Sequence, residues 1–314
     1  MHRRTLLAAA ALVPLAAARA QGAPIRFVLG FPAGTTADTS ARLFAAEMKD
    51  ALGGPIVVEN RVGGGGMIAA EYVAKAAPDG RTVLVASNGP MAINRHLGAR
   101  MPYDPDRDFV PVAMLGTSQQ LLIVPPSFGP RDFAAFLAVA REKEISYASV
   151  GTGSGSHLVM AGLVAEAGLK AQHVPYRGGP QALTDLVAGR VQAMILTAGS
   201  ALGLIADGKL LCLAQTGPGR LLPDVPTLAE LGFPGLELPT WNALYVPRGT
   251  PEDVVQRIAA AAVAARATPS VREGMAKAAF AMPALETDRL GAFVAAESER
   301  WAAIARATGV TMSD

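Results

Sequence analysis

The sequence has only one cysteine, Cys212, among its 314 residues. A single cysteine excludes a disulfide within the chain and any metal site that needs two thiolates. It lies in an apolar run at 210–214, which predicts a buried strand. We therefore expect an inert core thiol rather than a nucleophile.

The chain also lacks an excess of charge of either sign. It has 28 Lys and Arg against 26 Asp and Glu, a formal net charge of +2. Arg3, Arg4 and Arg19 lie in a segment that we expect to be removed, which leaves 25 positive residues against 26 and a net charge near −1. Nucleic-acid-binding proteins usually cluster positive charge, so no nucleic-acid partner is expected. The 51% of hydrophobic residues excludes a disordered chain.

The first twenty residues have the layout of an export signal. A cationic stretch at 1–4 precedes an apolar run of thirteen residues at 6–18, and Ala18 and Ala20 stand at the −3 and −1 positions of a cleavage site. Thirteen residues are too few to span a bilayer, so residues 1–20 are predicted to be a cleaved signal peptide. The arginine pair within 1–4 fits the twin-arginine route as well as the general secretory route. We expect an exported, water-soluble protein of a bacterial type.

Short β-rich runs alternate with alanine-rich helical stretches in two successive units. In the first unit a strand at 25–29 precedes a helix at 39–52, with Asp38 as its N-cap. Such alternation predicts parallel sheets covered by helices on both faces. A linker at 222–239, rich in proline and glycine, returns the chain to the first unit. The sequence thus predicts two α/β lobes joined by two crossings, with a cleft between them. The remaining strands are predicted at 55–59, 82–86, 121–124, 145–150, 172–174, 191–196, 210–214 and 244–246, an extended crossing at 110–115, and the remaining helices at 68–77, 133–141, 156–167, 181–188, 201–206, 251–267, 271–278 and 288–308.

Five of the predicted strands are followed by turns rich in Gly, Ser and Thr. In open α/β sheets ligands bind beyond the carboxyl ends of the strands, near helix N-termini. Small residues let backbone N–H groups approach a ligand, and several such turns facing one cleft could hold a carboxylate without a fixed cation. The turns lie at 31–38, 87–89, 151–157, 176–179 and 197–200.

Three sharper motif interpretations fail. The glycine pattern at 64–69 lacks the acidic residue that binds ribose, and the phosphate-loop spacing at 203–209 is followed by Leu210 instead of Ser or Thr. No cofactor is therefore expected. Ser156 and His157 suggest a serine hydrolase, yet no Gly-x-Ser-x-Gly elbow surrounds them, and adjacent residues on a helix point apart. We interpret His157 as ordering its turn. The other mature histidines, His96 and His173, stand singly without metal-ligand spacing, so no metal site is expected.

The turns and their flanks resemble one family, the Bug-type extracytoplasmic solute receptors of tripartite tricarboxylate transporters. The matching segments, in family order, lie at 31–42, 57–66, 74–80, 147–158, 173–179, 222–227 and 246–251. The resemblance implies a two-lobe periplasmic-binding-protein fold of the Venus flytrap, type II-like class, with lobe 1 at 24–117 plus 240–314 and lobe 2 at 118–239. It also implies capture of a small carboxylate, an inner-membrane permease as partner, and a monomer. One departure is that Thr35 follows Gly34, where the family commonly has a second glycine, and its Cβ restricts the loop.

The leading hypothesis is therefore a non-catalytic periplasmic receptor that closes on a small carboxylate. The alternatives are an exported serine hydrolase that uses Ser154 or Ser156, and an orphan receptor that acts in sensing rather than transport. Asp38 is expected to cap its helix, although it could hold a ligand amine, and Arg177 could pair a second carboxylate. The candidate ligand-binding residues are Phe31, Gly34, Thr35, Thr36, Asp38, Ser87, Asn88, Thr152, Gly153, Ser154, Ser156, Tyr176, Arg177, Gly178, Gly199 and Ser200.

Overall fold

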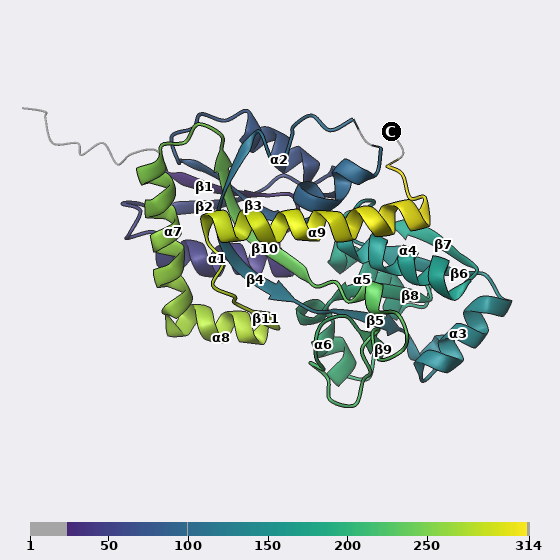
Figure 1. Ribbon diagram of the computed structural model, residues 1–314. Coiled ribbons are helices and arrows are strands. Elements are labelled where there is room, and N and C mark those ends of the chain that lie inside the picture. Colours follow the sequence, from purple (N-terminus) through teal and green to yellow (C-terminus); the bar gives the residue numbers. More distant parts are fainter. Residues whose placement is uncertain (1–23, 99, 313–314) are drawn as a thin grey trace, which may run out of the picture.

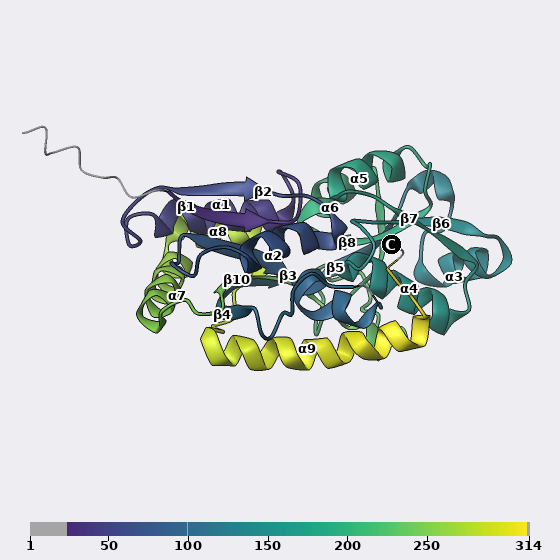
Figure 2. The same ribbon diagram turned by 90° about the horizontal axis from the view of Figure 1, so that it is seen from above.

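The computed structural model describes residues 24–98 and 100–312. The predicted signal peptide, residues 1–20, lies outside these ranges. The described chain forms two lobes side by side, each a β-sheet with helices packed against it (Figure 1, Figure 2). We call the six-stranded sheet with its helices lobe 1 and the five-stranded sheet with its helices lobe 2. The predicted two-lobe α/β fold is confirmed.

The sheet of lobe 1 has the strand order β11-β4-β10-β3-β1-β2. Its strands are β1 (Ile25–Leu29), β2 (Ile56–Asn60), β3 (Thr82–Ser87), β4 (Phe109–Ser118), β10 (Thr240–Pro247) and β11 (Phe280–Ala281). Successive side chains of a strand point to opposite faces of the sheet. Phe27 therefore joins Phe44 in one core cluster, whereas Val28 joins Val73 on the other face. The first face is covered by α1 (Thr36–Met48), α7 (Glu252–Ala267) and α8 (Pro269–Lys277), and the second carries α2 (Met67–Ala74).

The sheet of lobe 2 has the order β7-β6-β8-β5-β9. Its strands are β5 (Gln120–Val124), β6 (Ile145–Ser149), β7 (Ala171–Pro175), β8 (Ala193–Thr197) and β9 (Leu211–Gln215). Leu121 packs with Leu186 on one face, while Leu122 belongs to the cluster of Phe136 and Leu158 on the other. The first face is covered by α5 (Gly179–Val187) and α6 (Ala198–Ala206), the second by α3 (Phe133–Glu142) and α4 (Gly155–Ala167).

The prediction of purely parallel sheets is wrong, because each sheet contains reversed strands. In lobe 2, β5 runs antiparallel to both β8 and β9. In lobe 1, β10 runs antiparallel to β3 and β4, and β11 is antiparallel to β4. Both β5 and β10 are strands by which the chain enters one lobe from the other, so they arrive without the helical crossover that makes neighbouring strands parallel.

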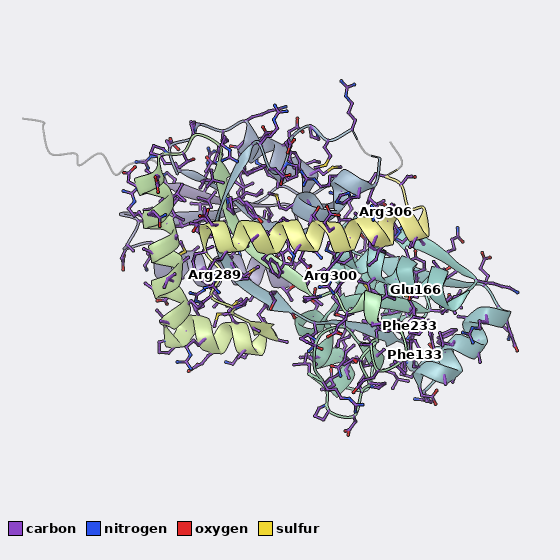
Figure 3. All side chains as sticks on the ribbon, in the orientation of Figure 1. Phe133, Glu166, Phe233, Arg289, Arg300 and Arg306 are labelled. Atoms are coloured by element: carbon purple, nitrogen blue, oxygen red, sulfur yellow. The ribbon has the colours of Figure 1, made fainter. Side chains whose placement is uncertain are left out.

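The two lobes are joined at the sheets and also along one side. β4 passes to β5 through Gln119 alone, and residues 216–239 return the chain from β9 to β10. Helix α9 (Thr287–Thr308) runs along both lobes, contacting β4 in lobe 1 and α4 in lobe 2 (Figure 1, Figure 2). Arg300 of α9, visible in Figure 3, donates to the carbonyl of Glu237 at 2.6 Å and so ties the helix to the return segment. None of the helices in residues 24–98 and 100–312 is both long and apolar enough to cross a membrane.

Candidate functional site

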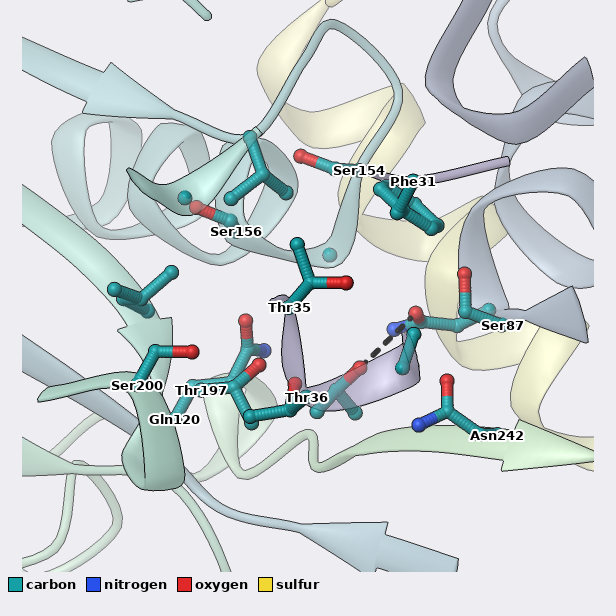
Figure 4. A pocket seen from close by; sticks show the side chains of 17 residues that line it. Phe31, Thr35, Thr36, Ser87, Gln120, Ser154, Ser156, Thr197, Ser200 and Asn242 are labelled. Carbon is teal, nitrogen blue, oxygen red and sulfur yellow. Dashed lines mark hydrogen bonds between the residues drawn. The ribbon is translucent and has the colours of Figure 1, made fainter. Parts of the chain in front are cut away.

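A cavity of about 60 Å³ lies between the two lobes (Figure 4). One water needs roughly 10–15 Å³ on this measure, so the cavity has room for several waters or for a small ligand. Lobe 1 contributes Phe31, Thr35, Thr36, Ala37, Ser87, Asn88, Thr240 and Asn242. Lobe 2 contributes Gln120, Val150, Ser154, Gly155, Ser156, Gly179, Leu196, Thr197 and Ser200.

No charged side chain is among these seventeen lining residues. Polar atoms come from hydroxyl and amide groups, and apolar surface comes from Phe31, Val150 and Leu196. A ligand in this cavity would thus be held by neutral donors and by the backbone, with apolar walls along its carbon skeleton.

Five helix N-termini meet at the cavity, each at the end of a strand. Helix α1 follows β1, a short π-helix η2 (Gly89–Ile93) follows β3, and α4, α5 and α6 follow β6, β7 and β8. Their N-cap residues are Thr35, Asn88, Ser154, Gly178 and Thr197. First-turn N–H groups have no carbonyl partner within a helix, and the macrodipole adds partial positive charge there. The five turns noted in the sequence therefore bring positive potential to one place.

The N-terminus of α1 begins three residues earlier than the sequence predicted. Thr35, not Asp38, is the N-cap, and its Oγ1 accepts the N–H of Asp38 at 3.3 Å. Asp38 lies in the first turn, where its carboxylate accepts from Gly34 N–H, from Asn60 and twice from Arg42. Burial alone would raise the pKa of the Asp38 carboxyl, but these hydrogen bonds lower it below the ordinary value. The acid therefore shapes the loop before α1 and does not line the cavity.

The N-terminus of α4 presents its backbone to the cavity because its side chains bond elsewhere. Ser154 Oγ accepts the N–H of His157 at 3.2 Å and donates to the carbonyl of Gly151 at 2.7 Å. Ser156 Oγ donates to the carbonyl of Ile195. Within the described residues neither hydroxyl is bonded to an imidazole, so neither Ser154 nor Ser156 forms the serine–histidine pair that a hydrolase needs.

The sequence predicts sixteen candidate ligand-binding residues. Half of them line the cavity: Phe31, Thr35, Thr36, Ser87, Asn88, Ser154, Ser156 and Ser200. Tyr176 instead donates its hydroxyl to Asp185 at 2.8 Å, and Arg177 is exposed. Gly34 lies in the loop before α1 and donates its N–H to Asp38 in the first turn of that helix. Thr152, Gly153, Gly178 and Gly199 lie where the lobes touch.

Those contacts between the lobes are close approaches of a glycine to the other lobe, which a Cβ would disturb. An alanine at Gly178 would place its Cβ 2.8 Å from Cγ of Pro32 in lobe 1, and one at Gly65 would meet the Thr152 carbonyl of lobe 2 at 2.7 Å. At Gly199 the nearest atom is the carbonyl oxygen of Ala278. The two lobes are thus in direct contact beside the cavity.

Sequence reasoning missed the polar side chains that come from the strands between the lobes. Gln120 opens β5, and Thr240 and Asn242 open β10. The alternation of Thr240 and Asn242 around Trp241, which is buried on the opposite face, could have indicated two side chains aimed at the cleft. Asn88 is among the predicted residues, and its Nδ2 is a buried donor without a partner in residues 24–98 and 100–312. Such a donor at a cavity wall is available to a ligand oxygen.

The remaining titratable groups show no metal chemistry. Within the described residues no cluster of His, Cys, Asp and Glu could hold a metal ion.

Burial raises the pKa of the Cys212 thiol to about 12, although its hydrogen bond to the Ala214 carbonyl acts in the other direction. His157 bonds to its turn as predicted, accepting the N–H of Gly153. His173, far from His157 in the sequence, stacks its ring on that of His157.

The chain resembles proteins of one receptor family along most of its length. The sequence model of the tripartite tricarboxylate transporter family receptors matches residues 40–310. A protein from the tcbD–tcbE intergenic region of Pseudomonas sp. (strain P51) is 39% identical over 311 residues, which cover 96% of this chain and 92% of that protein. BugT of Bordetella pertussis is 34% identical over 305 residues, covering 95% and 93%.

Solved structures give the same family. A Rhodopseudomonas palustris protein with adipate superposes with a TM-score of 0.87 at 32% identity, covering 92% of this chain and 98% of that one. MatC from the same species, with bound malate, gives 0.84 at 34%, covering 90% and 98%. The periplasmic binding protein BugD gives 0.85 at 30%, covering 92% and 98%. The chain belongs to the receptor family of the tripartite tricarboxylate transporters, which includes the Bug proteins.

Proposed function

We propose that this protein is a non-catalytic periplasmic receptor that closes its two lobes on a small carboxylate and presents it to a permease of the tripartite tricarboxylate type. The observation that supports this most is the composition of the cavity wall. It contains no charged side chain, yet helix N-termini from both lobes meet there. Two relatives hold adipate and malate, both dicarboxylates.

Thr36 and Ala37 of lobe 1 line the same cavity as Gly155 and Ser156 of lobe 2, and all four lie in the first turns of α1 and α4, where N–H groups have no carbonyl partner within the helix. Thr35 and Ser154, the caps, occupy the next N–H groups along each helix. A hydrogen bond to a charged acceptor contributes roughly 1.5–3 kcal/mol, and each helix end about 0.3–1 kcal/mol more. Because these donors belong to different lobes, a carboxylate contacts the full set only in the closed form, and binding therefore favours closure.

The hydrogen bonds at the start of α4 argue against an exported serine hydrolase, because the hydroxyls of Ser154 and Ser156 both donate to carbonyl oxygens. Delivery to a permease, rather than signalling to another membrane partner, rests on the family to which the chain belongs. Growth of a deletion strain on the bound acid would separate the two roles: loss of uptake supports transport, and unchanged uptake with altered gene expression supports sensing.

Thermal unfolding of the mature protein, refolded to remove carried-over ligand, tests the proposal against mono-, di- and tricarboxylates, aromatic acids and acidic amino acids. A ligand at 100 times its dissociation constant adds about 2.7 kcal/mol and raises the midpoint by several degrees. The Ser154→Phe variant, which fills the cavity, should lose that shift. Absence of any shift across the panel, or a shift that survives in Ser154→Phe, would contradict a carboxylate site in this cavity.

A further inference from the structure

Two histidines lie behind the lobe 2 wall of the cavity with their rings stacked. The ring centroids of His157 in α4 and His173 in β7 are 3.7 Å apart, and the planes differ by 9°. Tyr147 of β6 extends the stack, with its centroid 5.2 Å from that of His173. His157 is only 4% exposed and directly follows Ser156, which lines the cavity.

His157 bonds directly to one glycine of the loop at 151–154, and His173 is linked to another through Ser149. The N–H of Gly153 donates to Nδ1 of His157 at 3.4 Å. Nε2 of His173 lies 2.7 Å from Oγ of Ser149, which accepts the N–H of Gly151 at 3.2 Å. As the acceptor of Gly153, Nδ1 of His157 is unprotonated, and the ring carries its proton on Nε2. Burial lowers the pKa of both rings, to about 3 for His157, where His173 adds a smaller effect, and to about 4 for His173, so the stack is neutral at ordinary pH.

The same loop makes the contact with lobe 1. In the amide orientation that satisfies both carbonyls, Nδ2 of Asn94 donates to the carbonyls of Gly153 at 2.9 Å and Gly89 at 3.3 Å. The carbonyl of Thr152 lies against Gly65 of lobe 1, where a Cβ would be 2.7 Å away. Gly153 is thus held from within lobe 2 through its N–H and reached from lobe 1 through its carbonyl.

We propose that the stacked pair of His157 and His173 is the positioning element of the ligand site, which holds residues 151–154 where Gly153 can meet Asn94 as the lobes close. The two histidines set ligand affinity without touching the ligand. This rests on the proposed function, because affinity depends on the stability of the closed form. Weakening the closed form by a given factor lowers the apparent affinity by the same factor.

Two variants of one residue separate positioning from packing. His157→Phe keeps a stacked ring but removes the acceptor, whereas His157→Asn keeps an oxygen near the position of Nδ1 and removes the ring. Amide hydrogen exchange of Gly153, followed in the ligand-free protein, reads the loop directly. Calorimetric titration with malate and with adipate reads the affinity, and the unfolding midpoint of each variant reports general damage.

We expect His157→Phe to speed exchange at Gly153 and to weaken binding, each about tenfold, since a buried N–H loses its only acceptor in the loop. His157→Asn should keep the exchange rate of Gly153 and the ligand affinity within about threefold of the wild-type values. Wild-type exchange and affinity in His157→Phe would overturn the proposal, as would equal losses in both variants, which indicate packing alone. If the exchange difference appears while the wild type binds no acid of the whole carboxylate panel, the positioning of the loop stands and the carboxylate function fails.

Discussion

Acidification from pH 7 to pH 5 should destabilise the fold through the two stacked imidazoles. Burial lowers the pKa of His157 to about 3 and that of His173 to about 4. In the unfolded chain both return to about 6.5. The unfolded state therefore binds more protons throughout this interval, so stability is fully present above pH 6.5 and is lost as the pH falls. Integration over pH 7 to 5 gives about 2 kcal/mol for each ring and about 4 kcal/mol for the pair.

Such a loss should lower the unfolding midpoint of a chain of this size by about 6 °C. Urea unfolding at half-unit steps from pH 7.5 to 5 measures the slope of the unfolding free energy against pH. The double variant His157→Asn, His173→Gln carries no imidazole at either place and should lose most of that slope, whatever its absolute stability. The comparison removes the contribution of Glu297, whose pKa is raised by burial and which acts in the opposite direction in both proteins. Equal slopes in the two proteins would refute the conclusion that the stacked rings stay neutral.

Four further changes test other parts of the structure. Gly178→Ala should weaken ligand binding about tenfold with little loss of stability, because the φ of 161° suits any residue while the new Cβ would press on Pro32 across the cleft. An unaltered calorimetric affinity would argue against a closed arrangement of the lobes in the ligand complex. Ser200→Leu should abolish the ligand-induced thermal shift while its ligand-free unfolding midpoint stays within about 2 °C of the wild-type value, because Ser200 lines the cavity from the first turn of α6. A retained shift would place the ligand elsewhere. Asp38→Asn should cost about 1–2 kcal/mol in urea unfolding at pH 7, because it removes the charge from a carboxylate with four donors, and a loss below about 0.3 kcal/mol would show that the network contributes little. Cys212 should resist a thiol-specific disulfide reagent at pH 8 until the protein is denatured, as its pKa of about 12 implies; rapid labelling of the folded protein would contradict that burial.

The elements of the fold could be predicted because local pattern and tertiary burial agree. The helix expected at 288–308 is α9 (Thr287–Thr308), and the strand expected at 145–150 is β6 (Ile145–Ser149). Strand direction could not be predicted in the same way. Nothing in the apolar run at 121–124 shows that the chain enters lobe 2 from another sheet, which is what makes β5 antiparallel to its neighbours.

The candidate site could likewise be predicted only in part. Turns rich in Gly, Ser and Thr pointed to the helix N-termini, because ligands bind beyond the carboxyl ends of strands. The donor of Gln120 could not be predicted, since it opens a strand and a polar side chain there can equally well face solvent, whereas Asn242 was indicated only by its alternation around Trp241. The N-cap of α1 was misplaced because Thr35 and Asp38 are both good caps, and only the bond from Asp38 N–H to Thr35 Oγ1 decides between them.

A crystal structure of the refolded protein with the acid that raises its midpoint most would test the central claim directly. We expect a carboxylate between the lobes, with its oxygens about 2.7–3.2 Å from the N–H groups of Thr36, Ala37, Gly155 or Ser156, or linked to them through one water. We also expect Nδ2 of Asn88, which has no partner within residues 24–98 and 100–312, to bond to the ligand or to that water. An acid bound outside this cavity, or one held there by the side chain of Arg177 rather than by backbone donors, would contradict it.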